Sequence, residues 1–216
     1  MTLPGLVELM RKDIPDEKWL LYLRGLEKFG NDEPEADGWT GYVIAAFDGA
    51  LGGYTNTRGG RYVTGLYSVT AHQYFGKITG ALPHGRRRGE AFASGIAPVN
   101  GMDRKGPTAL LNSVNSIDFT RIANGVNFNL QFDQALLKGE KGASLLDALL
   151  STYFERGGMQ VQVNAFDPRI LVEARNDPHK YPHLLVRVSG YSAYFNDLAP
   201  AMKDEIISRT VIACIH

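Results

Sequence analysis

The segment that carries most information about the fold runs from Leu184 to Phe195 and reads LLVRVSGYSAYF. Its first part lies within His183–Val188, a short apolar run that predicts a buried strand. Gly190 follows between polar and aromatic neighbours. Glycine is common in the turn after a strand because it adopts a positive φ without steric cost. From these residues alone we expect a strand that ends in a tight turn at Gly190.

The regions on either side of this strand alternate between two periodicities. Val126–Phe132 alternates apolar residues with Asn127, Asn129 and Gln131, which predicts a strand with one hydrogen-bonding face, and Met159–Ala165 alternates again. Helices are expected from a cap at Ser144 through Phe154, from Asp167 to Arg175, and from Pro200 to Thr210. Strands that alternate with helices predict βαβ units, a mainly parallel sheet and therefore an α/β fold.

The N-terminal half has a different character. Helical spacing predicts Leu3–Arg11, a helix from Asp16 to Phe29, and a third over Glu35–Ala50 that is apolar on most sides and so should be buried on more than one face. Tyr54–Gly106 has little periodicity and is rich in small and polar residues, and a loop region of this length usually lines a site. A further helix is expected over Thr108–Ile117.

Composition excludes several classes of protein. Twenty-three Lys and Arg balance twenty-three Asp and Glu, which favours neither a nucleic-acid nor a membrane partner. The longest apolar run, Tyr42–Phe47, is too short to span a bilayer. The single cysteine, Cys214, excludes an internal disulfide, and the charged residues within Met1–Leu23 argue against an export signal. We therefore expect a cytoplasmic location.

Two other polar motifs are weak. His179 and His183 have the spacing of a helical zinc pair, but Pro182 lies between them, so they cannot share a helix face and no metal site is expected. The basic run Arg86–Arg88 is followed by Glu90, which favours a solvated loop or ion pairs over a phosphate site.

The segment Arg187–Phe195, RVSGYSAYF, resembles the radical loop of the glycyl radical enzymes, the pyruvate formate-lyase-like family. The end of the final helix, Ile206–Thr210, is similar to the family as well. Further segments resemble family landmarks in the family's order: KFGND at 28–32, TRGG at 57–60, PHGR at 83–86, GPTA at 106–109 and GGMQVQ at 157–162. The resemblance implies the C-terminal part of a pyruvate formate-lyase-like α/β barrel, with a partial barrel region of helices and Gly-rich loops over residues 1–120 and a glycine radical domain over 121–216.

By this resemblance Gly190 carries an organic radical. The residues expected to support its loop are Arg187, Val188, Ser189, Tyr191, Ser192 and Phe195. Loss of a hydrogen atom from the Gly190 Cα leaves an unpaired electron shared with the flanking amide nitrogen and carbonyl, which requires coplanar peptide groups that a side chain would obstruct. A packed, water-free setting is also needed, and we expect Leu184–Val188 with Tyr194 and Phe195 to supply it.

The chain also departs from the family pattern. Members are several times longer, and their catalytic thiol lies upstream in a Gly-Cys-x-Glu loop that is absent here; Cys214 lies downstream of Gly190 and receives no role. We therefore expect this chain to store the radical while a complementary chain with that loop, or a full-length homologue, holds the cysteine and most of the small-molecule substrate pocket. The reaction would be that of a lyase, dehydratase, decarboxylase or formate C-acetyltransferase, and Ser192–Phe195 resembles the dehydratase and decarboxylase branch more closely.

The resemblance further implies a separate activating enzyme that uses S-adenosylmethionine and an iron–sulfur cluster to install the radical, so the chain should bind no cofactor of its own. A second interpretation is a repair protein resembling the autonomous glycyl radical cofactor, which replaces a C-terminus cleaved by oxygen. Such proteins look shorter, whereas the likeness here reaches back to Lys28. A third is a degenerate product without a radical, against which the intact loop argues.

Overall fold

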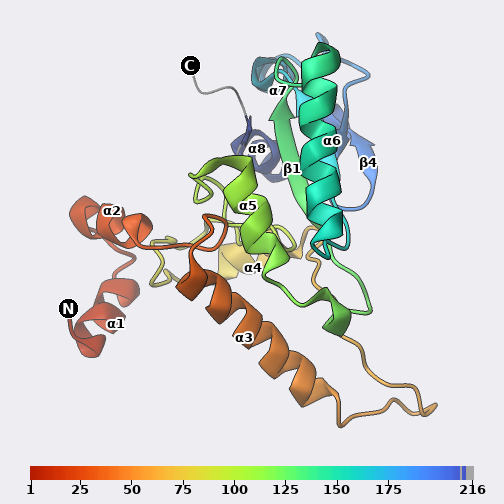
Figure 1. Ribbon diagram of the computed structural model, residues 1–216. Coiled ribbons are helices and arrows are strands. Elements are labelled where there is room, and N and C mark those ends of the chain that lie inside the picture. The colour runs from red at the N-terminus through yellow and green to blue at the C-terminus, as the bar shows by residue number, and fades with distance from the viewer. Residues whose placement is uncertain (210, 213–216) are drawn as a thin grey trace.

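The computed structural model describes residues 1–209 and 211–212, with Val211 described by its backbone alone (Figure 1). Its helices are α1 (Leu3–Arg11), α2 (Glu17–Gly25), α3 (Pro34–Leu51), α4 (Ala71–Ile78), α5 (Gly106–Asn115), α6 (Gly139–Glu155), α7 (Pro168–Asn176) and α8 (Pro200–Ser208). The strands are β1 (Asn129–Asp133), β2 (Gln162–Phe166), β3 (Leu185–Arg187), β4 (Ser192–Tyr194) and β5 (Val211–Ile212), and short 3₁₀ turns occupy Phe119–Arg121 and Phe195–Asp197.

Two small sheets organise the C-terminal half. β1 is the central strand of a three-stranded parallel sheet, paired with β2 through Asn129 and Gln162 and with β5 through Gln131 and Val211. The chain passes from β1 to β2 through α6, which confirms the predicted βαβ unit. β3 and β4 form a separate antiparallel hairpin, so the strand expected within His183–Val188 does not join the parallel sheet. β4 and β5 were not predicted, because strands of two or three residues are too short to show a periodicity.

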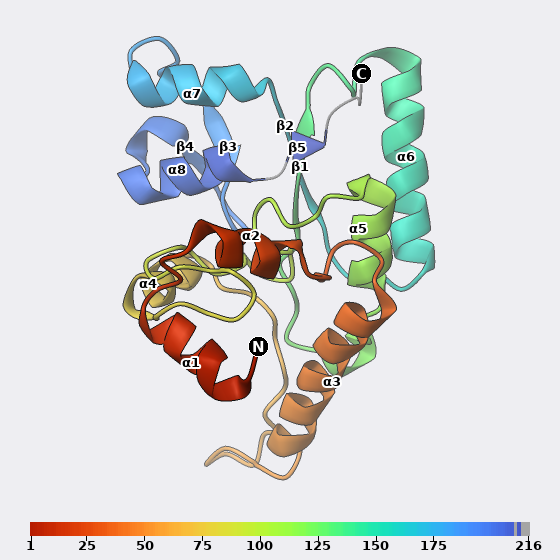
Figure 2. The ribbon, with the colours of Figure 1, turned by 90° about the vertical axis from the view of Figure 1, so that its left-hand side faces the viewer.

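Helices cover the parallel sheet on two sides (Figure 2). α5 and α6 lie on one side, where Phe128, Phe132 and Tyr153 are fully buried in the largest apolar cluster. α7 and α8 lie on the other side with the hairpin, and a second cluster there contains Val188 and Phe195. The hairpin is therefore part of a core of its own beside the parallel sheet.

Local capping signals predicted two helix starts correctly. The Asp16 carboxylate accepts the N–H of Lys18 at 2.8 Å before α2, and the Asp167 carboxylate accepts the N–H of Arg169 at 3.0 Å before α7. The expected cap at Ser144 is wrong, because α6 begins at Gly139. Gly142 lets the first turn of α6 pack against the Leu137 backbone, which a side chain at that position would overlap.

The expectation that the third helix is buried on more than one face is also wrong. In α3 the side chains of Tyr42 and Phe47 are 65% and 56% exposed, and Asp37 is the buried residue of the helix. The reason is visible in Figures 1 and 2, where α3 extends away from both sheets. Within residues 1–209 and 211–212, no helix combines the length and the apolar character that a bilayer crossing requires.

Candidate functional site

Gly190 lies in the tight turn that joins β3 to β4. The hairpin pairs Arg187 with Ser192, and beyond that pair the Val188 N–H donates to the Tyr191 carbonyl at 2.9 Å, which leaves Ser189 and Gly190 as the turn. Gly190 has φ +87°, in the left-handed region that favours glycine. A β-carbon at Gly190 would have no heavy atom within 4 Å, so the backbone conformation and not a lack of space calls for glycine.

The hairpin is buried at its base and open at its tip. Val188 and Phe195 are fully buried, and Ser189 is nearly so. Gly190 and Tyr191 are exposed, so the expectation of a packed setting around Gly190 is wrong for the described residues. The physical reason is that Val188 and Phe195 belong to the apolar cluster beside α7 and α8, whereas Gly190 and Tyr191 are not part of it.

Side chains of β2 bind the hairpin from one side. The Gly190 N–H donates to Oε1 of Gln162 at 3.1 Å. Two residues further along the same face of β2, Oδ1 of Asn164 accepts the Arg187 N–H at 3.1 Å and its Nδ2 donates to the Arg187 carbonyl at 3.3 Å. Both side chains are buried. They take the place of ladder hydrogen bonds between the parallel sheet and the hairpin.

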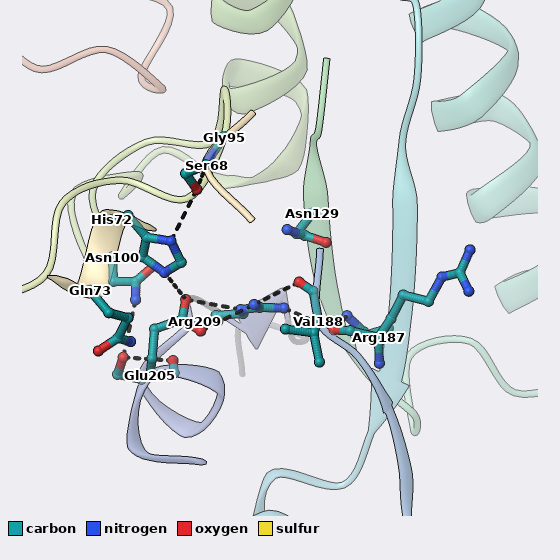
Figure 3. A network of polar contacts seen from close by, with 12 residues as sticks. Ser68, His72, Gln73, Gly95, Asn100, Asn129, Arg187, Val188, Glu205 and Arg209 are labelled. Atoms are coloured by element: carbon teal, nitrogen blue, oxygen red, sulfur yellow. Dashed lines mark hydrogen bonds and ion pairs between the residues drawn. The ribbon is translucent and has the colours of Figure 1, made fainter. Parts of the chain in front are cut away.

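Arg209, the residue that follows α8, binds the hairpin from the other side, as Figure 3 shows. Its Nη1 donates to the carbonyl of Arg187 at 3.1 Å, and its Nη2 donates to the carbonyl of Val188 at 3.0 Å. Nε and Nη2 also donate to the two carboxylate oxygens of Glu205 at 3.2 and 3.1 Å. Because this ion pair is almost fully buried, its hydrogen bonds to the hairpin help to offset the cost of removing both charges from water.

The irregular N-terminal region joins this network through His72. His72 Nε2 lies 3.8 Å from Glu205 Oε1, and Nδ1 lies 3.0 Å from the Ser68 hydroxyl oxygen, which also accepts the Gly95 N–H at 3.2 Å (Figure 3). Burial lowers the pKa of His72, and Glu205 opposes this while Arg209 adds to it. The region predicted to be a long loop contains the helix α4, so that part of the prediction is wrong. The region does border the candidate site, and it does so through His72 of α4, which contacts Glu205 of α8.

A small cavity adjoins Arg209 on the polar face of β1. Its volume is about 30 Å³, and Ser94, Asn129 and Gln131 are among the residues that line it. Each of these three side chains has a buried oxygen without a hydrogen-bond partner among the described residues. The hydrogen-bonding face predicted for this strand therefore faces the interior next to the Arg209 network.

The structure also locates the remaining residues singled out in the sequence. Across the hairpin, Arg187 Nη1 donates to the Ser192 hydroxyl at 3.1 Å, and Tyr191 is exposed. Cys214 lies outside the described residues. In the parts of the chain that the structure describes, no three His, Cys, Asp or Glu side chains lie close enough to hold a metal ion.

The basic run is less solvated than expected. Arg86 is buried and donates to the Gly80 carbonyl at 2.7 Å, whereas Arg87 pairs with Glu17 at 3.4 Å, as the ion-pair alternative predicted.

Gln162, Glu205, Arg209 and His72 were not identified as site residues from the sequence. Gln162 and Arg209 lie within segments that resemble family landmarks, GGMQVQ and IISRT, and this was the available signal. His72 has no such signal, because its partner Glu205 is far away in the sequence and meets it only in the folded chain.

Comparisons with known proteins agree with this geometry. A family model described as glycine radical matches residues 92–196, and one described as pyruvate formate lyase-like matches residues 1–76. The chain is 38% identical to trans-4-hydroxy-L-proline dehydratase of Clostridioides difficile over 85% of this chain and 23% of that protein. It is 35% identical to indoleacetate decarboxylase of Tractidigestivibacter scatoligenes over 95% of this chain and 24% of that protein.

Solved structures give the same result. A glycerol-bound B12-independent glycerol dehydratase from Clostridium butyricum matches with a TM-score of 0.95 and 38% identity, over 99% of this chain and 27% of that one. The chain thus spans about a quarter of the length of the relatives it matches. The predicted α/β fold of the pyruvate formate-lyase-like type is confirmed, and the boundary expected between residues 120 and 121 stays a prediction.

Proposed function

Because the chain belongs to the glycyl radical enzyme family, we propose that these residues are the radical-storing C-terminal part of such an enzyme and that Gly190 carries the radical. The observation that carries the proposal is the turn itself. Gly190 lies at the tip of a hairpin whose backbone is held by Gln162 on one side and by Arg209 on the other. Such support keeps one glycine Cα in a defined place while leaving it open to a reacting group.

Radical formation removes one hydrogen atom from the Gly190 Cα, and the acceptor is supplied by a separate activating enzyme that uses S-adenosylmethionine and an iron–sulfur cluster. The Cα becomes planar, and its half-filled orbital overlaps best with the amide nitrogen when the two groups are coplanar. At φ +87° the Gly190 N–Cα bond is far from that arrangement. The turn must therefore rotate when the radical forms, and the open space at the Gly190 tip allows this.

The next step needs a thiol that this chain does not place near Gly190 in any Gly-Cys-x-Glu context. We assign that thiol to a cysteine loop on polypeptide outside these 216 residues, which in our interpretation is a complementary chain. The S–H bond breaks and the hydrogen atom moves to the Gly190 Cα, which restores the C–H bond and leaves a thiyl radical to attack the substrate. The exposure of Gly190 supports this step, because the sulfur atom must approach the Cα closely.

The reaction class proposed is dehydration or decarboxylation of a small molecule. Identity to the hydroxyproline dehydratase and to the indoleacetate decarboxylase is 38% and 35%, against 31% to formate acetyltransferase 1 of Escherichia coli. This difference agrees with the likeness of Ser192–Phe195 to the dehydratase and decarboxylase branch.

Anaerobic activation followed by electron paramagnetic resonance tests the proposal. The chain, with and without the complementary polypeptide, is expected to give a doublet whose splitting collapses when the chain carries glycine deuterated at Cα. Gly190→Ala should give no such signal. Gly157→Ala is the matched control, because Gly157 also has a positive φ, +96°, and lies in the distant turn after α6. A glycyl doublet that persists in Gly190→Ala would overturn the assignment.

A further inference from the structure

We propose that Gln162 tunes and positions the radical, because its side-chain oxygen holds the N–H of the glycine that carries the unpaired electron. This inference rests on the proposed radical at Gly190. It assigns to a residue of β2 an effect on where the electron density lies, in addition to its effect on the shape of the hairpin.

The parallel sheet fixes the position of Gln162. It pairs with Asn129 of β1, its backbone N–H donates to the Phe128 carbonyl at 2.7 Å, and its side chain is among the buried polar groups. The side chain reaches from the sheet to the turn, where the distance from Gly190 N to Gln162 Oε1 is 3.1 Å, within the normal range for N–H···O. A buried amide anchored in this way presents its oxygen to Gly190 with little freedom to move.

The hydrogen bond affects the electron distribution of the radical. Once the Cα has lost its hydrogen atom, the Gly190 nitrogen donates electron density into the half-filled orbital. An acceptor on the N–H polarises the bond and increases the electron density at nitrogen, which makes it a better donor. Gln162 performs this without gaining or losing an atom, because the amide is no base and the N–H proton stays on Gly190.

The bond also determines which part of the turn rotates. Coplanarity requires a large change in φ from +87°, and this can move either the nitrogen side or the carbonyl side of Gly190. On the nitrogen side, Arg209 holds the Val188 carbonyl, Ser189 is buried and Gln162 holds the N–H. On the carbonyl side, the Tyr191 side chain is exposed, and the Tyr191 carbonyl accepts the Val188 N–H at 2.9 Å. The rotation is therefore taken up towards Tyr191 with the loss of this hydrogen bond, and the nitrogen keeps its acceptor.

Three variants separate this role from simple support. Gln162→Met has a similar length and lacks the oxygen, and Gln162→Glu replaces the amide oxygen with a stronger, charged acceptor. Asn164→Leu is the matched control, because it removes hydrogen bonds of the same kind from the same face of β2 to Arg187 without touching Gly190. Each chain is labelled with ¹⁵N-glycine and activated anaerobically, and the ¹⁵N and N–H proton couplings are measured by electron–nuclear double resonance.

We expect the Gly190 ¹⁵N coupling to fall in Gln162→Met and to rise in Gln162→Glu, and to stay at the wild-type value in Asn164→Leu whatever the radical yield. The yield in Gln162→Met should fall roughly two- to fivefold, as for the loss of one hydrogen bond. Wild-type couplings in Gln162→Met would overturn the role of Gln162 and leave the radical at Gly190 in place. If Gln162→Met accumulates no radical, an unchanged coupling in Gln162→Glu would overturn it instead. A wild-type signal without glycine couplings would overturn the proposed function itself.

Discussion

Arg209 binds both the Glu205 carboxylate and the hairpin carbonyls, so its substitution affects stability and the position of the hairpin together. Removing the guanidinium leaves the Glu205 carboxylate buried and unpaired, and it also frees the carbonyls of Arg187 and Val188. We expect Arg209→Met to lower the free energy of unfolding by about 3–5 kcal/mol, the usual cost of breaking a buried pair. Chemical denaturation of the purified chain measures this loss.

The double variant Glu205→Leu/Arg209→Met distinguishes stability from positioning. With both charges removed, most of the stability should return. The two hairpin carbonyls still lack their donor, so we expect radical yield to remain low. A double variant that forms the radical at the wild-type level would limit Arg209 to a role in stability.

Single residues were predictable from the sequence where their chemistry is local. A turn at Gly190 with positive φ could be predicted because glycine adopts that conformation at low steric cost, and the helix caps at Asp16 and Asp167 depend on groups two residues away. The bonds of Gln162 and Arg209 to the hairpin span 28 and 21 residues, so no local pattern reports them.

The packing of α4 against α8 should make the protein sensitive to acid. The pKa of His72 lies below its ordinary value of 6.5, so the folded chain binds fewer protons at this site than the unfolded chain does. The free energy of unfolding is therefore expected to decrease as the pH drops below about 6.5, because the unfolded chain then takes up a proton at His72 that the folded chain binds less readily. Thermal unfolding between pH 5 and 8 should show a steeper dependence for the wild type than for His72→Gln.

Burial also lowers the pKa of His84, so the variant His84→Gln serves as the comparison for His72→Gln. His84→Gln should remove its own share of the acid sensitivity and leave the share due to His72. Equal slopes in the wild type and in His72→Gln would contradict the link between α4 and α8.

Helices and strands could be predicted from the sequence where their own residues determine their structure. α1 has the bounds that the periodicity predicts, and α6 joins parallel strands as expected. Burial of α3 was wrongly predicted, because an apolar surface shows what a helix can bury and not what is present to cover it. Tyr42 and Phe47 are the clearest examples.

At the scale of the molecule, the exposed apolar side of α3 leads to a prediction about assembly. Large apolar side chains that are exposed together, such as Tyr42 and Phe47, usually contact another protein surface. We expect the isolated chain to turn over no substrate and to become active only with polypeptide that contains the Gly-Cys-x-Glu loop. The double variant Tyr42→Ser/Phe47→Ser should weaken the affinity for that polypeptide at least about tenfold, because apolar area that the complex buries is lost. The free energy of unfolding of the isolated chain should stay nearly unchanged, because both side chains are already exposed. Glu140→Gln, an exposed change on α6, is the control.

Cys214→Ser belongs to the same anaerobic assay, because the proposal gives its thiol no chemistry. Complemented activity should survive this substitution. Turnover by the isolated wild-type chain that disappears in Cys214→Ser would instead make Cys214 the thiyl site. The cysteine loop on a complementary polypeptide would then not be needed.

The contacts around Gly190 do not depend on its covalent link. β3 and β4 pair on either side of the turn, the Phe195 N–H donates to the Leu184 carbonyl at 2.7 Å, and Arg209 reaches back from beyond the turn to Val188. If dioxygen reached the radical and broke the backbone at Gly190, these contacts would keep the severed C-terminal segment bound to the rest of the chain. The nicked molecule would keep its shape in native buffer and come apart only in denaturant. Any replacement segment would first have to dislodge the broken one.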